Sequence, residues 1–140
     1  MVDKTLILKK LSNVEEYLKQ IKEFSDISVK DYDANWKIQR IVERTLQIMI
    51  ESCLDVAGHI ISDAGFRVPE TYVDMFRILT ENGILKEKQL AALEKMARFR
   101  NIVVHDYAKI DSEIVIGILQ RNLVDFEKFN QAIIDYLKTL

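Results

Sequence analysis

The chain has 140 residues, of which 49% are hydrophobic and 30% charged, proportions that are typical of a globular protein and exclude a disordered tail. Twenty Lys and Arg residues against 22 Asp and Glu residues give a net charge of -2, so nucleic-acid binding would need a local basic patch. Four Gly and one Pro are too few for the many turns of an all-β protein.

The remaining bulk features concern the cellular compartment. One cysteine cannot form an internal disulfide, which suits a reducing cytosol. The opening MVDKTLILKK has too short an apolar stretch for a signal peptide, and no run approaches the roughly 20 apolar residues that span a bilayer. We therefore expect a cytoplasmic protein, made of one domain over residues 1–140, that has no contact with a membrane.

Few helix breakers interrupt the chain, so long helices are the expected structure. The first is predicted from about Asp3, a capping residue, to Phe24. Its apolar residues alternate spacings of four and three, which indicates packing along one narrow line. This seam consists of Ile7, Leu11, Val14, Leu18 and Ile21.

The second predicted helix runs from about Asp31 to Ala64, and Gly65 is suited to follow its last turn. Its apolar residues cover more than one stripe, which is typical of a helix that is buried on more than one side. They are Trp36, Ile41, Val42, Leu46, Ile48, Met49, Ile50, Cys53, Leu54, Val56, Ala57, Ile60 and Ile61. In so small a domain, this width indicates a subunit interface as well as a core.

Three further helices are predicted in the second half of the chain. Pro69 opens a short one over residues 70–81, which Asn82 and Gly83 end because both tolerate positive φ. The others cover about 86–107 and 111–140, and Asp111 is suited to cap the second of these. Four long helices and one short one predict an all-α, up-and-down helical bundle.

The fourth helix carries an arginine where its pattern calls for an apolar residue. On a helical wheel Arg100 lies between Leu93 and Val104 on one side and Met96 and Val103 on the other. A buried guanidinium is costly unless it is paired, reaches solvent or binds an anion. Two interpretations stay open: an ion pair inside the bundle, or an arginine held in a cleft to bind phosphate.

Three neighbours of Arg100 favour the phosphate interpretation. His105 can exchange a proton near neutral pH, Asn101 can donate to an anion, and Tyr107 carries a hydroxyl beside them. Arg100 and His105 are about 140° apart on the wheel, so one straight helix does not point both at the same spot. Together with the wide apolar surface of the second helix, this favours a symmetric dimer with a shared cleft.

Residues 100–107, RNIVVHDY, form an R-x4-H-x-Y string that resembles the signature of the HEPN superfamily. The resemblance is strongest to the HepT toxins of the HepT/MntA (HEPN/MNT) toxin–antitoxin systems, and it covers nearly the whole chain. The stretch DVAGHI over residues 55–60 and the stretch NGIL over residues 82–85 resemble the family as well. Further matching positions are Gly65, Pro69, Tyr72, Asp74 and Phe76.

The resemblance implies the toxin of a type VII toxin–antitoxin system, a dimeric and metal-independent endoribonuclease whose paired motifs form one composite site at the dimer interface. Arg100 would steady the scissile phosphate, His105 would do acid–base work, and Asn101 would be the polar residue that follows the arginine. The implied partner is a minimal nucleotidyltransferase antitoxin, which uses ATP to attach AMP to Tyr107 and so blocks RNA entry. The toxin itself would need no cofactor.

Basic residues offer a candidate path for the RNA backbone. Lys37, Arg40 and Arg44 share a face of the second helix, and Arg98 precedes the motif. A solvated face that binds nothing is the competing interpretation for each of them.

A row of possible metal ligands recurs every four residues on the second helix. It consists of Glu51, Asp55, His59 and Asp63. Each step of four drifts by about 40°, so the four cannot reach one ion, and no metal site is predicted. Cys53, in an apolar run with no basic neighbour, is expected to be a core residue.

Three functions therefore stay open, of which the first two are implied by the resemblance. The first is the ribonuclease toxin. The second is a non-catalytic subunit that binds a nucleotide or substrate for a nucleotidyltransferase, with the same Arg100 and His105 holding phosphate. The third is a structural helical adaptor in which Arg100 sits in a buried ion pair.

Overall fold

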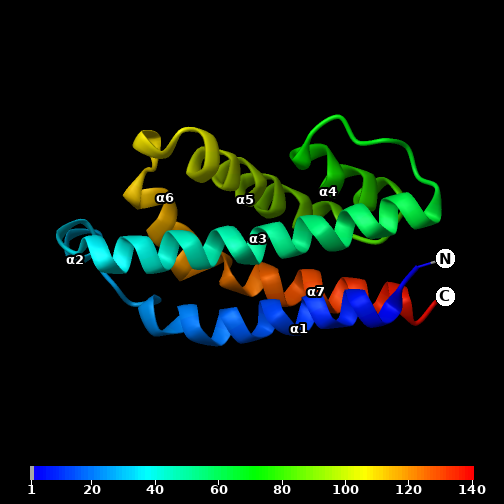
Figure 1. Cartoon of the computed structure of the whole chain (residues 1–140), viewed down its shortest axis with the longest axis horizontal. Helices are drawn as coiled ribbons and strands as arrows, with labels where there is room; N and C mark the ends of the chain where they lie inside the picture. The colour runs from blue at the N-terminus through cyan, green and yellow to red at the C-terminus, as the bar shows by residue number, and fades with distance from the viewer. Residues whose placement is uncertain (1) are drawn as a thin grey trace.

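The computed structural model describes residues 2–140, which are helical with connecting turns and contain no strand. The helices that make the bundle are α1 (Lys4–Ile21), α3 (Trp36–Ala64), α4 (Tyr72–Glu81), α5 (Glu87–His105) and α7 (Leu123–Leu137). Successive long helices run in opposite directions, and α1 begins at the end of the bundle where α7 ends (Figure 1). The prediction of an all-α, up-and-down bundle is confirmed.

The four long helices form a closed ring of contacts. α1 and α5 each pack on both α3 and α7, while α4 packs on α3 and α5. In Figure 1, α4 and α5 lie on one side of α3, and α1 and α7 lie on the other. The predicted seam of α1 is buried along its whole length, as are most apolar residues of α3.

Capping residues set several helix ends where the sequence predicts them. Asp3 and Asp111 each accept a hydrogen bond from a backbone N–H in the first turn of the following helix, at 3.0 and 2.9 Å. Gly65 ends α3 with φ of 70°, in the left-handed region that glycine adopts without strain. Gly83 has φ of 76°, but Asn82 has φ of -97°, so only the glycine uses that region.

The predicted second helix is broken, contrary to expectation. A short helix α2 (Val29–Ala34) precedes α3, and Asn35 between them is extended, with φ of -128° and ψ of 94°. Its side-chain oxygen accepts hydrogen bonds from the N–H groups of Lys37 and Ile38, at 3.1 and 3.2 Å. The break follows because an Asn side chain competes for backbone donors and so favours a cap over a helix interior. It folds α2 back so that Tyr32 is buried against α3.

Two other helices are shorter than predicted. α5 ends at His105, and Tyr107 lies in the single turn η2 (Tyr107–Lys109), although the helix is predicted to reach residue 107. The predicted last helix is divided into α6 (Ser112–Gly117), a π-helical turn η3 (Ile118–Asn122) and α7. A wider turn shifts the angular phase of the residues that follow it.

Some apolar side chains lie outside the core. Trp36 is 63% exposed and Ile41 is 50% exposed, so the N-terminal part of α3 does not bury its whole apolar surface within this chain. Val104, placed in the apolar arc of the fourth helix, is also exposed. It lies in the last turn of α5, where the helix leaves the bundle.

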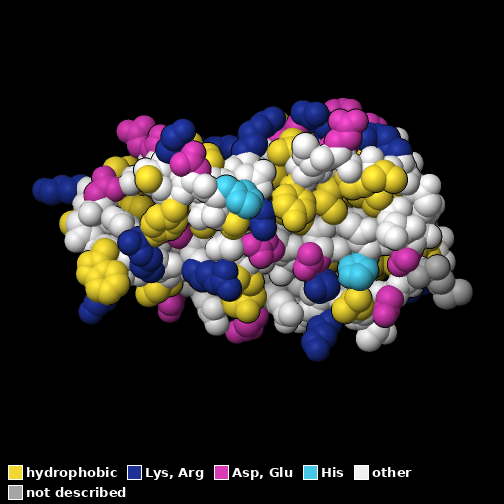
Figure 2. Space-filling model, turned by 45° about the horizontal axis from the view of Figure 1, so that its top comes forward, with side chains coloured by type: hydrophobic (Ala, Val, Ile, Leu, Met, Phe, Trp, Pro, Cys, Tyr) yellow, Lys and Arg dark blue, Asp and Glu magenta, His cyan; other side chains and the backbone are white. Residues whose placement is uncertain are grey.

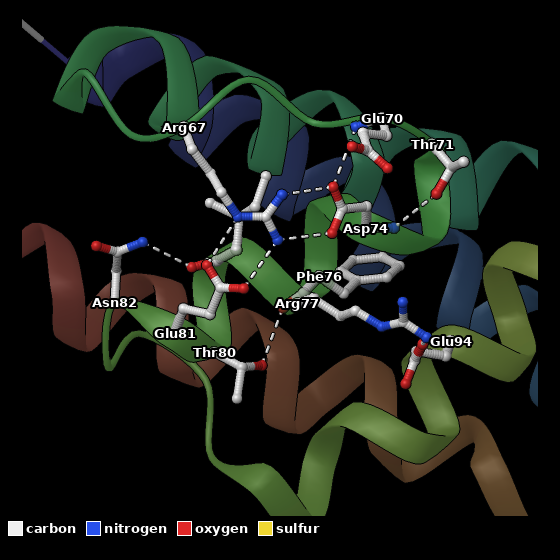
Figure 3. A network of polar contacts seen from close by, with 11 residues as sticks. Arg67, Glu70, Thr71, Asp74, Phe76, Arg77, Thr80, Glu81, Asn82 and Glu94 are labelled. Carbon is white, nitrogen blue, oxygen red and sulfur yellow. Dashed lines mark hydrogen bonds and ion pairs between the residues drawn. The ribbon is translucent and has the colours of Figure 1, made fainter.

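A network of ions ties the segment before α4 to that helix (Figure 3). The Arg67 guanidinium donates to both Asp74 oxygens at 2.7 Å and to Glu81 at 2.8 and 2.9 Å. Asp74 is buried and also accepts the N–H of Glu70 at 3.0 Å. The helix starts at Tyr72, two residues later than predicted, because the hydroxyl of the preceding Thr caps the N–H of Asp74. The network thus fixes the position of Tyr72, the first residue of α4.

The Asp74 carboxylate should stabilise the fold in a pH-dependent way. The hydrogen bonds from Arg67 lower the pKa of Asp74 from 3.8 to about 2. The stabilisation is therefore complete above the ordinary carboxyl pKa and is lost as the pH falls towards 2. Asp74→Asn should lower the free energy of unfolding by about 1–2 kcal/mol at pH 7, the scale of charged hydrogen bonds.

Urea unfolding of wild type and Asp74→Asn from pH 7 to pH 2 measures this effect. The difference between the two proteins should shrink below about pH 4. Glu16→Gln, at an exposed position of α1, is the control and should show little difference at any pH. A gap between wild type and Asp74→Asn that stays constant down to pH 2 would contradict the role of the charge.

Candidate functional site

The exposed end of α5 carries the arginine that the sequence singled out. The Arg100 side chain is 13% exposed, and its Nε lies 3.4 Å from Glu51 Oε1 on α3. Its Nη1 donates to Asn101 Oδ1 at 3.2 Å, and its guanidinium lies over the ring of Tyr72, 4.7 Å from the centroid. These two hydrogen bonds leave donors of the guanidinium available, because arginine has five N–H groups.

The contact between Arg100 and Glu51 is only a partial ion pair. The Glu51 side chain is 36% exposed, and the same oxygen accepts the amide of Gln47 at 2.8 Å. Because the distance is long and Glu51 is in contact with solvent, we expect the pair to contribute about 1 kcal/mol, the upper range for exposed pairs. Arg100 also lines a small cavity of about 150 Å³ together with Glu51 and Tyr72. The guanidinium is therefore not sealed inside the bundle.

His105 opens onto a different and larger cavity. It lines a space of about 670 Å³ with Asn101 and Ile102 of α5 and with the segment around Tyr72. Figure 2 shows both histidines of the chain on one face, with hydrophobic side chains gathered beside one of them. The wall of this cavity is mostly apolar, and Arg100 is not part of it.

The structure separates Arg100 from His105, as the helical wheel predicts. Tyr72 lines both cavities, while Asn101 bonds the guanidinium and also faces the histidine's cavity. One copy of the chain therefore brings Asn101 near each of the two groups but does not bring the two groups together. Completion of the site by a second copy stays a prediction.

Tyr107 is anchored to a buried carboxylate on α3. Its hydroxyl donates to Glu43 Oε1 at 2.6 Å, and the Tyr32 hydroxyl donates to Oε2 of the same carboxylate at 3.1 Å. The Arg40 guanidinium lies over the Tyr107 ring, 5.1 Å from its centroid. Partial burial, and after it the hydrogen bond and charge of Glu43, raise the pKa of Tyr107. Tyr107 is thus a neutral phenol at pH 7, and it is 44% exposed.

Sequence reasoning missed Glu43, Tyr32 and Tyr72 as members of this region. Glu43 left a signal, because it stands three and seven residues before the core positions Leu46 and Ile50 and so lies on an apolar stripe. Tyr32 left none, since its burial depends on the break between α2 and α3.

The predicted basic residues do not form one patch. Lys37, Arg40 and Arg44 are exposed on the first turns of α3, and Arg40 lies against Tyr107. Arg98 instead lies 3.7 Å from Glu94, which Arg77 contacts at 2.6 Å. Basic and acidic side chains alternate on the face shown in Figure 2. Arg98 therefore belongs to a surface ion network rather than to a basic track.

The four residues of α3 that recur every four positions and could in principle bind a metal do not converge on one site. Asp55, His59 and Asp63 line a shallow cavity of about 320 Å³, and Asp55 pairs with Lys10 at 3.4 Å. Among residues 2–140, no three His, Cys, Asp or Glu side chains are grouped as they would be around a metal ion. Cys53 is buried, as predicted, and burial raises the pKa of its thiol.

No helix in the described part of the chain combines the length and the apolar character that crossing a bilayer requires.

Comparison with known proteins gives related sequences over almost the whole chain. A family model described as ribonuclease HepT-like matches residues 14–133. The mRNA nuclease HepT of Shewanella oneidensis is 31% identical over 129 residues, which are 91% of this chain and 96% of that protein. The tRNA nuclease HepT of Aphanizomenon flos-aquae is 28% identical over 139 residues, 99% of this chain and 95% of that protein.

The fold agrees with a solved structure of the same kind. The tri-AMPylated HEPN toxin of Shewanella oneidensis, in complex with MNT antitoxin, superposes with a TM-score of 0.84 at 30% identity. The match covers 96% of this chain and 99% of that one. A matching family model over most of the length and a shared bundle give the same assignment: the chain belongs to the ribonuclease HepT-like family.

Proposed function

We propose that this protein is the ribonuclease toxin of a toxin–antitoxin system and that it cleaves RNA as a homodimer without a metal ion. The observation that carries the proposal is the exposed end of α5. There Asn101 bonds an arginine with unused donors and also lines the cavity of an exposed histidine. The named activities of the two similar HepT nucleases support RNA as the substrate.

The proposed reaction gives a separate role to each of three residues, Arg100, Asn101 and His105. A guanidinium offers donors that match phosphate oxygens, so Arg100 would hold the scissile phosphate and the charge that builds up on it. His105 would take the proton of the attacking 2′-hydroxyl or give one to the leaving 5′-oxygen. Asn101, already bonded to Arg100, would fix the guanidinium and contact the same phosphate. A fixed cation and a proton carrier together meet the main needs of this cleavage.

A second copy of the chain accounts for the separation of the two groups. In a twofold dimer, each surface of one copy meets the same surface of the other. Such pairing can set the His105 of one copy beside the Arg100 of its partner, across the face that carries Tyr72. The exposed Trp36 and Ile41 on α3 are apolar surface that a partner could cover.

Regulation in this proposal acts on Tyr107. A cognate minimal nucleotidyltransferase would transfer AMP from ATP to its hydroxyl. The basic residues proposed to bind RNA lie nearby on α3, where Arg40 contacts the Tyr107 ring; they are Lys37, Arg40 and Arg44. An added phosphate two residues from His105 would repel the RNA backbone and fill the cleft. The AMPylated toxin bound to its MNT antitoxin, in the similar solved structure, supports this partner and this modification.

A competing function is supported by the cavity beside His105. Its volume of about 670 Å³ and mostly apolar wall are typical of a small-molecule site. The chain would then be a non-catalytic subunit that binds a nucleotide for its nucleotidyltransferase. Calorimetric titration with ATP and AMP, beside cleavage assays on varied RNAs, separates the two. Tight nucleotide binding without any cleavage favours the subunit.

Substitution of the motif tests the nuclease. Purified wild type should cleave RNA in EDTA, while Arg100→Ala and His105→Ala should each lose at least about 100-fold in rate, the lower range for acid–base and charge-stabilising groups. Arg100→Ala should lower the free energy of unfolding by only about 1 kcal/mol, because its ion pair is long and partly exposed. Gel-based cleavage and urea unfolding measure the two effects.

Lys88→Ala, on the exposed first turn of the same helix, is the matched control and should cleave like wild type. Cleavage that disappears in EDTA would refute metal independence, and full activity of Arg100→Ala would refute the site. A loss of several kcal/mol in Arg100→Ala would instead support the structural adaptor.

The modification is tested by intact mass. Wild type incubated with its cognate nucleotidyltransferase and ATP should gain whole AMP units and lose RNA cleavage. Tyr107→Phe should gain none and keep cleaving RNA in the same mixture, because the nucleophilic oxygen is absent. Tyr17→Phe on α1 should behave like wild type, and AMP found on Tyr107→Phe would place the modification elsewhere.

A further inference from the structure

Glu43 is a buried carboxylate whose ion pair with Arg40 is long. It is 6% exposed, and the nearest Arg40 nitrogen is 3.6 Å from Oε1. The other buried carboxylate among the described residues, Asp74, receives two guanidinium bonds of 2.7 Å. Burying a charge without such pairing is costly. The position of Glu43 therefore calls for an explanation beyond packing.

Each carboxylate oxygen of Glu43 accepts a hydrogen bond from a different tyrosine, and the two tyrosines differ in their exposure to solvent. Tyr32 donates to Oε2 at 3.1 Å and is itself 1% exposed. Tyr107 donates to Oε1 at the shorter distance of 2.6 Å, from a ring that is 44% exposed. Only the second phenol can be reached by a partner protein. The carboxylate thus has one fixed neighbour and one accessible neighbour.

Arg40 completes the arrangement from the solvent side. Its guanidinium covers one face of the Tyr107 ring at 5.1 Å from the centroid, and its side chain is 54% exposed. The contact limits rotation of the ring while leaving its edge open. Tyr32 bonds the carboxylate oxygen that does not face Tyr107, while Glu43 and Arg40 contact the accessible phenol.

We propose that Glu43 is the general base for nucleotidyl transfer to Tyr107, an inference that rests on the modification proposed above. The Tyr107 Oη attacks the α-phosphorus of ATP held by the nucleotidyltransferase. A bond forms between Oη and phosphorus, and the bond from phosphorus to the oxygen that bridges to the β-phosphate breaks. Pyrophosphate leaves with that electron pair, and the phenolic proton passes to Glu43 Oε1.

The chemistry of the phenol explains why a base is needed. Partial burial and Glu43 raise the pKa of Tyr107, so its oxygen carries a proton at neutral pH and is a weak nucleophile. A general base must lie within hydrogen-bond reach of the proton it removes, and the distance of 2.6 Å meets that condition before the partner binds. The toxin would then supply part of the machinery for its own modification.

Glu43→Gln is the decisive variant because glutamine keeps the shape and an acceptor oxygen for Tyr107 but cannot take its proton. With the cognate nucleotidyltransferase and ATP, followed by intact mass over time, its maximal rate of first AMP addition should fall at least about 100-fold. The toxin concentration that gives half the maximal rate should stay within a few-fold of wild type. Glu43→Asp, which keeps a carboxylate, should recover part of the rate.

Tyr32→Phe is the matched control. It removes the hydrogen bond to the other carboxylate oxygen and leaves the bond between Tyr107 and Glu43 in place, so its maximal rate should stay near wild type. Circular dichroism and thermal melting report whether each variant folds. If Glu43→Gln does not fold, the Glu43→Asp variant decides, since moving the carboxylate back from Oη should slow the transfer.

The outcomes separate this inference from the function on which it rests. A Glu43→Gln protein modified as fast as wild type means that the nucleotidyltransferase supplies the base, which overturns the role of Glu43 and keeps Tyr107 as the target. Equal slowing in Glu43→Gln and Tyr32→Phe, with weaker binding, reduces the cluster to a positioning role and also overturns it. Wild type that takes up no AMP overturns both the modification and the base.

Discussion

The antiparallel contact between α3 and α5 sets the geometry on which the other features of the site depend. Two glutamates of α3, Glu43 and Glu51, are eight residues apart, and the carboxylate of each one contacts one polar side chain of the motif. Because the helices run in opposite directions, the later glutamate meets Arg100 and the earlier one meets Tyr107. At 1.5 Å per residue the two glutamates are separated by about 12 Å along α3. Each of them thereby holds one end of the motif.

The segment before α4 adds a second constraint on the same arginine. Arg67, Asp74 and Glu81 hold the start of α4 in place, and that start carries Tyr72, whose ring lies against the Arg100 guanidinium. This ion network therefore helps to position Tyr72, which lines both the cavity of Arg100 and the cavity of His105. Carboxylate, ring and amide surround Arg100 without neutralising it fully, which is the state expected of a group that must bind an anion.

The two halves of the motif have different roles in the proposed toxin. Arg100 and His105 face separate cavities and would need a second copy to act on one phosphate, whereas Tyr107 has its own cluster within a single chain. RNA cleavage would then depend on dimer assembly, and inhibition on the Tyr107 hydroxyl of one chain. Because the two groups are close in the sequence, a modification at Tyr107 would obstruct chemistry at His105.

The sequence alone determined the all-α bundle, the seam of α1 and the caps at Asp3 and Asp111, because periodicity and capping are local properties. It also indicated the divergence of Arg100 and His105, since both lie on one helix whose angles follow from spacing. Asn35 breaks the predicted second helix through a local cap, which the apolar pattern did not reveal. Only the tertiary structure decided that Glu43 receives both Tyr107 and Tyr32, because those contacts join side chains from separate segments, and no local pattern encodes how two helices meet.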